Sequence, residues 1–169
     1  MRQYAAAINF LLRSTAVVLC LMAIPSCRPE IEHEISESPV PSTRLNVVAN
    51  SLPLLNAERS AAGLQPVRHS NRLTAAAREH ARNLAATGLF SHVGTNGDTP
   101  GDRVKAQGYG FCVVAENISK GRKSAFEVMK GWMKSSGHRL NILNPDVTEF
   151  GMASAAGDYW VLVLARPGC

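Results

Sequence analysis

One apolar run near the N-terminus decides how much of this chain can fold as a domain. Residues 15–24 carry no charge, and Arg2 and Arg13 are the only charged side chains among the first 26 residues. This length is typical of the apolar region of a secretory signal, and it is too short for a membrane span. We therefore expect residues 1–26 to be a signal peptide that adds nothing to the folded core.

A cysteine follows this segment directly. The stretch Ile24-Pro25-Ser26-Cys27 resembles the lipobox of bacterial lipoproteins. In that family the signal is cut just before the cysteine and the cysteine thiol is lipidated, so the resemblance implies a lipid anchor on Cys27. Cys20 is a poorer candidate because the bulky Leu19 precedes it. The alternative is plain secretion, which leaves Cys27 as a free thiol.

The next segment lacks the pattern of a folded element. Residues 28–44 contain four glutamates and three prolines and show no apolar periodicity, as expected of a solvated tether. The predicted organisation is a signal over 1–26, a lipidated cysteine and tether over 27–44, and a domain over 45–169. A domain of about 125 residues can bury a single core that needs no metal to fold.

The formal net charge is +5 and the pI is near 9.3, values that raise the question of nucleic-acid binding. Two arginines belong to the signal and four glutamates to the tether. The remaining basic residues are dispersed among acidic and apolar ones, without a basic stripe and interleaved aromatic residues. We expect no nucleic-acid partner and a surface that is either solvated or faces an anionic envelope.

Two cysteines remain for the domain, Cys112 and Cys169. In an oxidising compartment outside the cytoplasm such a pair is most simply a disulfide. The chain-entropy model gives it a stabilisation of about 4 kcal/mol. The alternative is a catalytic cysteine, which Cys112 suits poorly because it lies in an apolar stretch with no adjacent base.

Periodicity, capping residues and turn residues place helices first and strands mostly later. Helices are expected over 46–62, from 70 or 71 to 88, over 99–108, over 124–135 and over 137–143. Strands are expected over 111–118, 148–155 and 159–165, and the last two are joined by a hairpin turn. Three strands with several helices predict an α+β layered domain.

Several short motifs, taken in order, resemble the CAP superfamily of cysteine-rich secretory proteins, antigen 5 and pathogenesis-related 1, and most of all its bacterial SCP-like branch. The resemblance covers about 120 residues and rests on Leu55-Asn56-Ala57-Glu58-Arg59, Phe90-Ser91-His92, Glu116-Asn117-Ile118, Trp132-x-x-Ser135-x-x-His138-Arg139-x-Asn141-Ile142-Leu143, Phe150-Gly151-Met152 and Tyr159-Trp160-Val161. It implies a three-layer α-β-α sandwich with a small antiparallel sheet and a central cleft.

In that family two histidines and two acids line the cleft, and some members hold zinc or another divalent metal there. Carried over by motif, His92, Glu116 and His138 fill three of these positions. Ser135 stands where eukaryotic relatives have the second acid, which makes the site less anionic. His92 and His138, with Glu116 and water, are therefore the candidates for holding zinc.

Each of these residues also has a purely structural interpretation. His92 could be a cation at the C-terminus of a helix, and Glu116 could satisfy buried donors. Ser135 is expected to cap the helix that carries His138 rather than to act as a nucleophile. Glu127 is expected to belong to a capping box.

The neighbouring residues receive expectations of their own. Trp132 is expected to anchor the core, and His80 to be packed inside it. Asn141 is expected to bond the backbone near the turn at residues 144–145, and Arg139 to bridge to Glu116 or to a ligand.

Two functions follow from different classes. The first is a monomeric lipoprotein of the cell envelope that binds an envelope lipid, glycan or peptide. If the organism has an outer membrane, we expect the protein there, since Arg28 differs from the aspartate that retains some lipoproteins at the inner membrane. The alternative is a metal- or histidine-dependent hydrolase, of the protease or nuclease kind, in which His92 and His138 activate water and Glu116 acts as base.

Overall fold

The longest apolar run of the domain becomes the central strand β4 (Tyr159–Pro167). In the computed structural model, which describes residues 42–169 and their side chains from residue 46 onward, the first seven residues of β4 are buried. Burial of successive residues is typical of a strand that is covered on both faces. Alternate side chains of β4 enter two separate clusters, one on each face of the sheet.

Four strands form the sheet, in the order β1-β3-β4-β2. The strands are β1 (Arg68–His69), β2 (Phe111–Ser119), β3 (Glu149–Ala155) and β4. β4 runs antiparallel to β2 and β3, whereas β1 is parallel to β3. The two-residue strand β1 was not expected, so the sheet is mixed rather than purely antiparallel.

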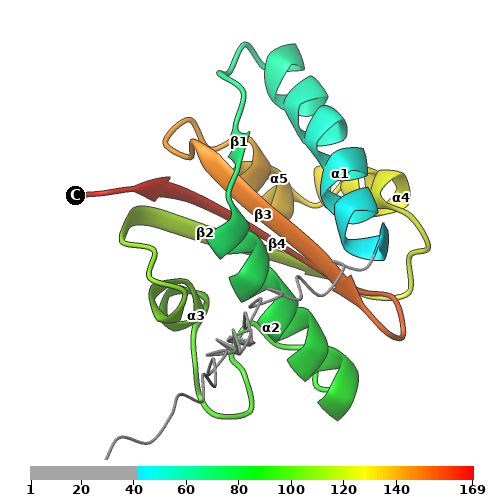
Figure 1. Ribbon diagram of the computed structural model, residues 1–169. Coiled ribbons are helices and arrows are strands. Elements are labelled where there is room, and N and C mark those ends of the chain that lie inside the picture. Colours follow the sequence, from blue (N-terminus) through cyan, green and yellow to red (C-terminus); the bar gives the residue numbers. More distant parts are fainter. Residues whose placement is uncertain (1–41) are drawn as a thin grey trace, which may run out of the picture. The chain divides into compact units, whose positions relative to one another are not determined.

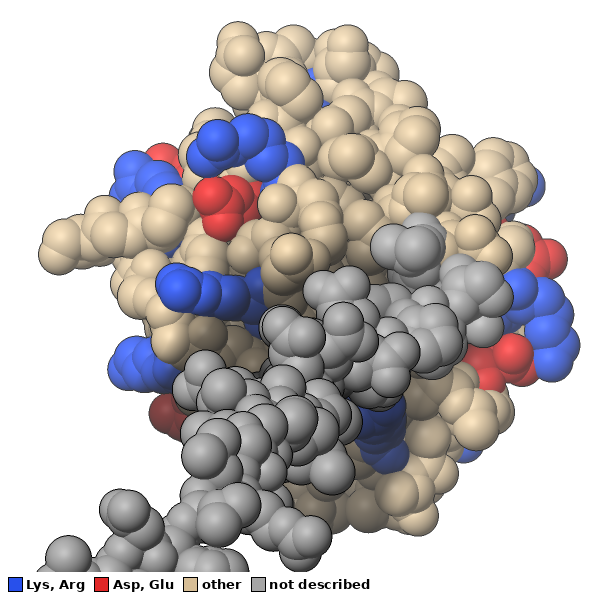
Figure 2. Space-filling model, in the orientation of Figure 1, with Lys and Arg blue, Asp and Glu red and all other residues tan. Residues whose placement is uncertain are grey.

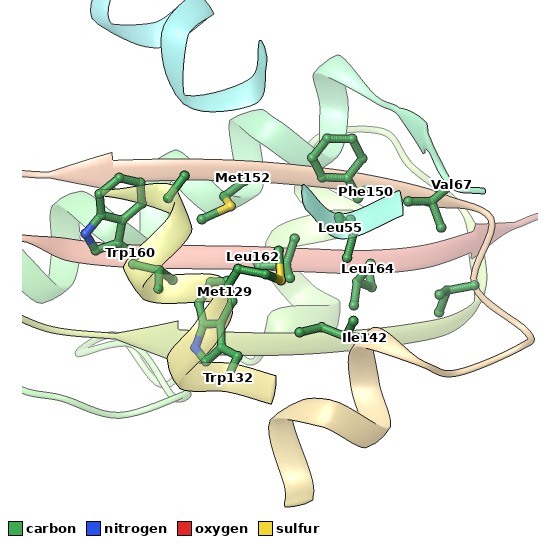
Figure 3. Close-up of a cluster of buried hydrophobic side chains, with 13 residues drawn as sticks. Leu55, Val67, Met129, Trp132, Ile142, Phe150, Met152, Trp160, Leu162 and Leu164 are labelled. Atoms are coloured by element: carbon green, nitrogen blue, oxygen red, sulfur yellow. The ribbon is translucent and has the colours of Figure 1, made fainter. Parts of the chain in front are cut away.

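Helices cover both faces of this sheet (Figure 1). α1 (Ser42–Ala61), α4 (Ala125–Met133) and α5 (Ser136–Ile142) pack on one face, and α2 (Asn71–Thr87) and α3 (Pro100–Ala106) on the other. Figure 3 shows the first core, where Trp160 and Leu162 of β4 meet Trp132 and Met129 of α4. The expected α-β-α sandwich of the α+β class is confirmed.

The predicted capping residues lie at the ends of helices α2, α3 and α4. Thr99 and Asp102 form a complete capping box at α3, and Gly88 ends α2 in the left-handed conformation with φ 73°. At α4 the Ser124 hydroxyl accepts from the Glu127 backbone N–H, and the Glu127 carboxylate accepts from the backbone N–H of the residue before the cap. Glu127 is therefore occupied with capping, as expected.

Helix α1 begins at Ser42, four residues before the helix expected from the sequence, and contains Pro53. The predicted signal, the predicted lipidation of Cys27 and most of the predicted tether lie outside the described residues. None of the helices in residues 42–169 combines the length and apolar character that crossing a bilayer requires.

A buried arginine fixes the segment that follows α5. Arg59 is 1% exposed, and its guanidinium donates to the backbone carbonyls of Gln65, Ile142, Asn144 and Val147 at 2.8–3.3 Å. Burial lowers the pKa of Arg59 from its usual value. The chain between α5 and β3 has few backbone partners of its own, and buried carbonyls need hydrogen-bond donors. Arg59 supplies these donors and so connects α1 to this segment.

Cys112 and Cys169 form a disulfide, with their Cα atoms 5.3 Å apart. It joins the beginning of β2 to the C-terminal residue, next to a register irregularity between Phe111 and Val113. The expected pairing is confirmed, and Cys112 is a structural rather than a nucleophilic residue.

Charged side chains are interspersed on the surface. Figure 2 shows basic residues at several separate places on this face, some of them next to acidic residues. Exposed ion pairs join Arg68 to Glu149 and Lys123 to Asp158. This distribution agrees with the dispersed charge read from the sequence.

Gly151 lets α2 approach the sheet closely. A Cβ atom at this position would collide with the backbone of Leu73 and Thr74 at the start of α2. We predict that Gly151→Ala lowers the free energy of unfolding by about 1–3 kcal/mol, since backbone on both sides leaves little room to relax. Urea denaturation measures the change. Gly137→Ala is the matched control, because its Cβ would meet no atom within 4 Å; an equal loss in both variants would contradict the explanation.

Candidate functional site

The site is built around the edge strand β2, which carries Glu116 and Asn117 side by side. Successive side chains of a strand point to opposite faces, and here they contact opposite helical layers. Glu116 contacts Arg103 of α3, while Asn117 donates to the backbone carbonyl of His138 in α5 at 3.0 Å. Adjacent residues of one strand therefore reach both sides of the sandwich.

Glu116 is a buried carboxylate whose side chain is 1% exposed. Its Oε1 lies 2.9 Å from Nδ1 of His92 and 3.7 Å from Nε2 of His80. Its Oε2 accepts from Nη2 of Arg103 at 2.8 Å. A buried charge has to be paired, and Arg103, which is itself 2% exposed, supplies the opposite charge. Both oxygens of Glu116 are thus committed within the protein.

His92 lies in the loop between α2 and α3, and its side chain is 50% exposed. The preceding turn is fixed because Nε2 of His80 lies 2.8 Å from the carbonyl oxygen of Ser91, and the Ser91 hydroxyl accepts from the Val93 backbone N–H at 3.0 Å. His92 is therefore not a cation at a helix C-terminus; its ring is held by the carboxylate of Glu116.

His138 lies on α5, on the other side of β2. Its ring centroid is 6.5 Å from that of Trp132. Burial lowers the pKa of His138, and the charge of His92 lowers this pKa further. A lowered pKa favours the neutral imidazole, which can donate a lone pair.

The structure differs in part from the expectations for three neighbouring residues. Ser135 occupies the N-cap position of α5, but its hydroxyl accepts no capping hydrogen bond. Asn141 donates to the carbonyl of Glu116 and to the amide oxygen of Asn117, at 3.3 and 2.8 Å, rather than to the later turn. The ion pair with Glu116 is made by Arg103 and not by Arg139, and a bridge from Arg139 to a ligand stays a prediction.

Two expectations for buried neighbours are confirmed. Trp132 is 2% exposed and belongs to the core, and His80 is fully buried. Sequence reasoning missed Arg103 altogether and missed the contacts of His80 with Ser91 and Glu116. One signal could have pointed to Arg103: Glu116 was expected inside the domain, and a buried carboxylate needs a cation beside it.

The site offers few side chains that could bind a metal ion. Within residues 42–169, no group of three or more His, Cys, Asp and Glu side chains is arranged to hold a metal ion. Glu116 is unsuited to direct ligation because Arg103 and His92 occupy its oxygens. A carboxylate bonded to Nδ1 in this way would orient His92 for a metal, and the donors left to hold one would be His92 and His138.

Two surface hollows lie away from these residues. One of about 320 Å³ is lined by α1, the start of α4 and the β3–β4 turn, and one of about 460 Å³ follows the outer side of α2. Neither is lined by His92, Glu116 or His138. The candidate site is therefore defined by its side chains and not by either hollow.

Fold and site together define a small α-β-α sandwich protein in which an edge strand carries a buried carboxylate that is bonded to a half-exposed histidine. Residues 52–164 match the family model of CAP, the cysteine-rich secretory protein family, and this chain belongs to that family.

Two proteins of Bacillus subtilis (strain 168) are related to it in sequence. YkwD is 38% identical over 108 residues, which are 63% of this chain and 42% of YkwD. The membrane protein YlbC is 29% identical over 101 residues, which are 60% of this chain and 29% of YlbC. The chain thus spans less than half of the length of either relative.

Solved structures share the fold. An extracellular protein of Bacillus anthracis that contains a SCP domain has a TM-score of 0.66 and 26% identity, over 70% of this chain and 40% of that one. An outer surface protein of Borrelia burgdorferi has a TM-score of 0.64 and 20% identity, over 69% of this chain and 90% of that one. The second likeness concerns the fold alone.

We predict that the protein loses stability between pH 7 and pH 5. Burial lowers the pKa of His80 and of His138, so the unfolded chain binds more protons in this range, and stability is full above about pH 6.5 and falls as the pH decreases. His80→Gln keeps a donor for the Ser91 carbonyl without titrating. The free energy of unfolding of this variant should depend less on pH than that of the unaltered protein. The difference between the two slopes should be at most about 1.4 kcal/mol per pH unit, the contribution of one titrating group. Urea unfolding at several pH values tests this, and an unchanged slope would contradict it.

Proposed function

We propose that this chain acts outside the cytoplasm as a binding module of the cell envelope, with His92 and His138 as the polar part of its site. The supporting observation is the pairing of Glu116 with Arg103 at 2.8 Å beneath His92. In a catalytic dyad an unneutralised carboxylate stabilises the imidazolium that forms during the reaction. Here Arg103 offsets that charge, so His92 is oriented by Glu116 but gains little as a base.

A hydrolase is the alternative that the hydrogen bond between His92 and Glu116 favours. Hydrolysis would also need a nucleophile or an activated water. Within the described part of the chain, the hydroxyl of Ser135 makes no hydrogen bond to either histidine. The arrangement therefore supports holding a ligand better than activating a nucleophile.

The loop that carries His92 also exposes apolar side chains. Leu89, Phe90 and Val93 are 50%, 49% and 46% exposed. Single exposed apolar residues are ordinary, but a group of large ones is typical of an interaction surface. Among the lipid, glycan and peptide classes, this group favours a ligand with an apolar portion, a lipid or an apolar peptide.

The edge of β2 is closed to a peptide that would add a strand. Asn141 donates to the carbonyl of Glu116, and Nε1 of Trp132 donates to the carbonyl of Ile118 at 3.1 Å. Strand addition needs these edge groups free. A peptide ligand would therefore bind over the side chains of the site rather than along residues 116–118.

Zinc is the simplest probe of the histidine pair. We predict that a zinc titration followed by calorimetry shows binding to the full chain and that His92→Ala and His138→Ala each weaken the affinity at least about tenfold, because neutral imidazoles are the donors available. His69→Gln is the matched control, since His69 belongs to β1 at the opposite edge of the sheet. Equal affinity in all four proteins would refute the metal part of the proposal.

Envelope attachment is tested separately. We predict that metabolic labelling with a fatty-acid analogue marks the protein and that Cys27→Ala abolishes the label, because Cys27 is the proposed acceptor of the lipid. Cys20→Ala should leave the label unchanged. Absence of label in the unaltered protein, or its persistence in Cys27→Ala, would refute the lipid anchor.

A further inference from the structure

His92 lies in a loop, where no regular backbone ladder fixes its position. Two buried side chains provide the missing constraints. His80 of α2 lies against the Ser91 carbonyl. Arg103 of α3 donates to three acceptors, on His92 and Asp98, in the loop between α2 and α3. These contacts show which residues decide where the ring of His92 lies.

Arg103 holds both ends of the segment from His92 to Asp98. Its Nη2 donates to the His92 carbonyl at 3.0 Å, and its Nη1 donates to the Asp98 carbonyl and carboxylate at 3.1 and 3.0 Å. The same Nη2 donates to Glu116. Because a guanidinium presents its donors in a rigid planar fork, Arg103 sets the backbone of His92 and the carboxylate that bonds its ring in one fixed relation.

This arrangement also selects the tautomer of His92. Glu116 forms a buried ion pair with Arg103 at 2.8 Å, and a carboxylate in an ion pair can only accept hydrogen bonds. Nδ1 of His92, which is 2.9 Å from Oε1 of Glu116, must therefore carry the proton. In the neutral ring the lone pair is then on Nε2.

We propose that Arg103 is the positioning residue of this site, and that through Glu116 it presents Nε2 of His92 as an electron-pair donor. The ligand group that contacts His92 is accordingly an electron-pair acceptor, namely a cation or a polarised N–H or O–H group. A carboxylate or phosphate oxygen does not fit this nitrogen while the ring is neutral. The statement about the ligand rests on the proposed binding function, whereas the statement about Arg103 and the tautomer does not.

The first experiment reads the tautomer without any ligand. Long-range proton–nitrogen NMR at pH 8, on the full chain with labelled histidine, should show His92 protonated on Nδ1. Arg103→Met should convert His92 to a mixture of tautomers, and Arg103→Lys, which keeps the charge but not the fork, should give an intermediate result. Arg72→Met is the matched control, because Arg72 also donates to a backbone carbonyl, that of Gly108.

A second experiment measures zinc affinity in the same variants. Arg103→Met should weaken zinc binding at least about tenfold, as loss of an orienting partner does at other metal sites, and Arg103→Lys should weaken it less. If Arg103→Met does not fold, Arg103→Lys and the unaltered protein carry the test.

The outcomes separate the two proposals. His92 protonated on Nε2 in the unaltered protein, or the same tautomer in every folded Arg103 variant, would overturn the role of Arg103. A tautomer that changes as expected, together with no zinc binding in any protein, would support the role of Arg103 and remove the metal part of the proposed function.

Discussion

The buried ion pair between Arg103 and Glu116 is the interaction on which the site depends. Glu116 by itself would be an uncompensated charge under the sheet edge, a situation that costs several kcal/mol in proteins. Arg103 removes this cost and uses its remaining donors on the loop that carries His92. Arg103 thus neutralises the buried carboxylate of Glu116 and fixes the loop, and Glu116 in turn orients the imidazole of His92. A hydrophobic replacement of the pair could preserve stability but would leave His92 without a position.

Arg59 solves a related problem on the opposite face. It donates to backbone carbonyls between α5 and β3, as Arg103 donates to carbonyls around His92. Each histidine of the site therefore lies in or next to a segment that a buried arginine holds. Arginine suits this task because it offers five donors that stay charged and fixed in one plane.

Much of the fold could be predicted from the sequence because its signals are local. The capping box at Thr99 and the uninterrupted apolar run of β4 act within a few residues of themselves. The group of His92, Glu116 and His138 came from family resemblance. Arg103 could not be found in this way, because its partner lies 13 residues away on another element. β1 was missed because two residues show no periodicity, and Ser135 has the residue type of a cap without its hydrogen bond.

The position of Glu116 next to Asn117 explains how one strand can gather a site from two helical layers. Glu116 faces α2 and α3, whereas Asn117 faces α5 and contacts the backbone of His138. A shift of β2 by one residue would exchange these faces, directing the carboxylate toward α5 and the amide toward Arg103. The register against β4, with Glu116 opposite Val163, is therefore a condition for the site. An edge strand is hydrogen-bonded to a neighbour on one side only. The disulfide from Cys112 to Cys169 gives β2 a second, covalent attachment, to the residues that follow β4. This attachment lies at the irregularity in the register between β2 and β4.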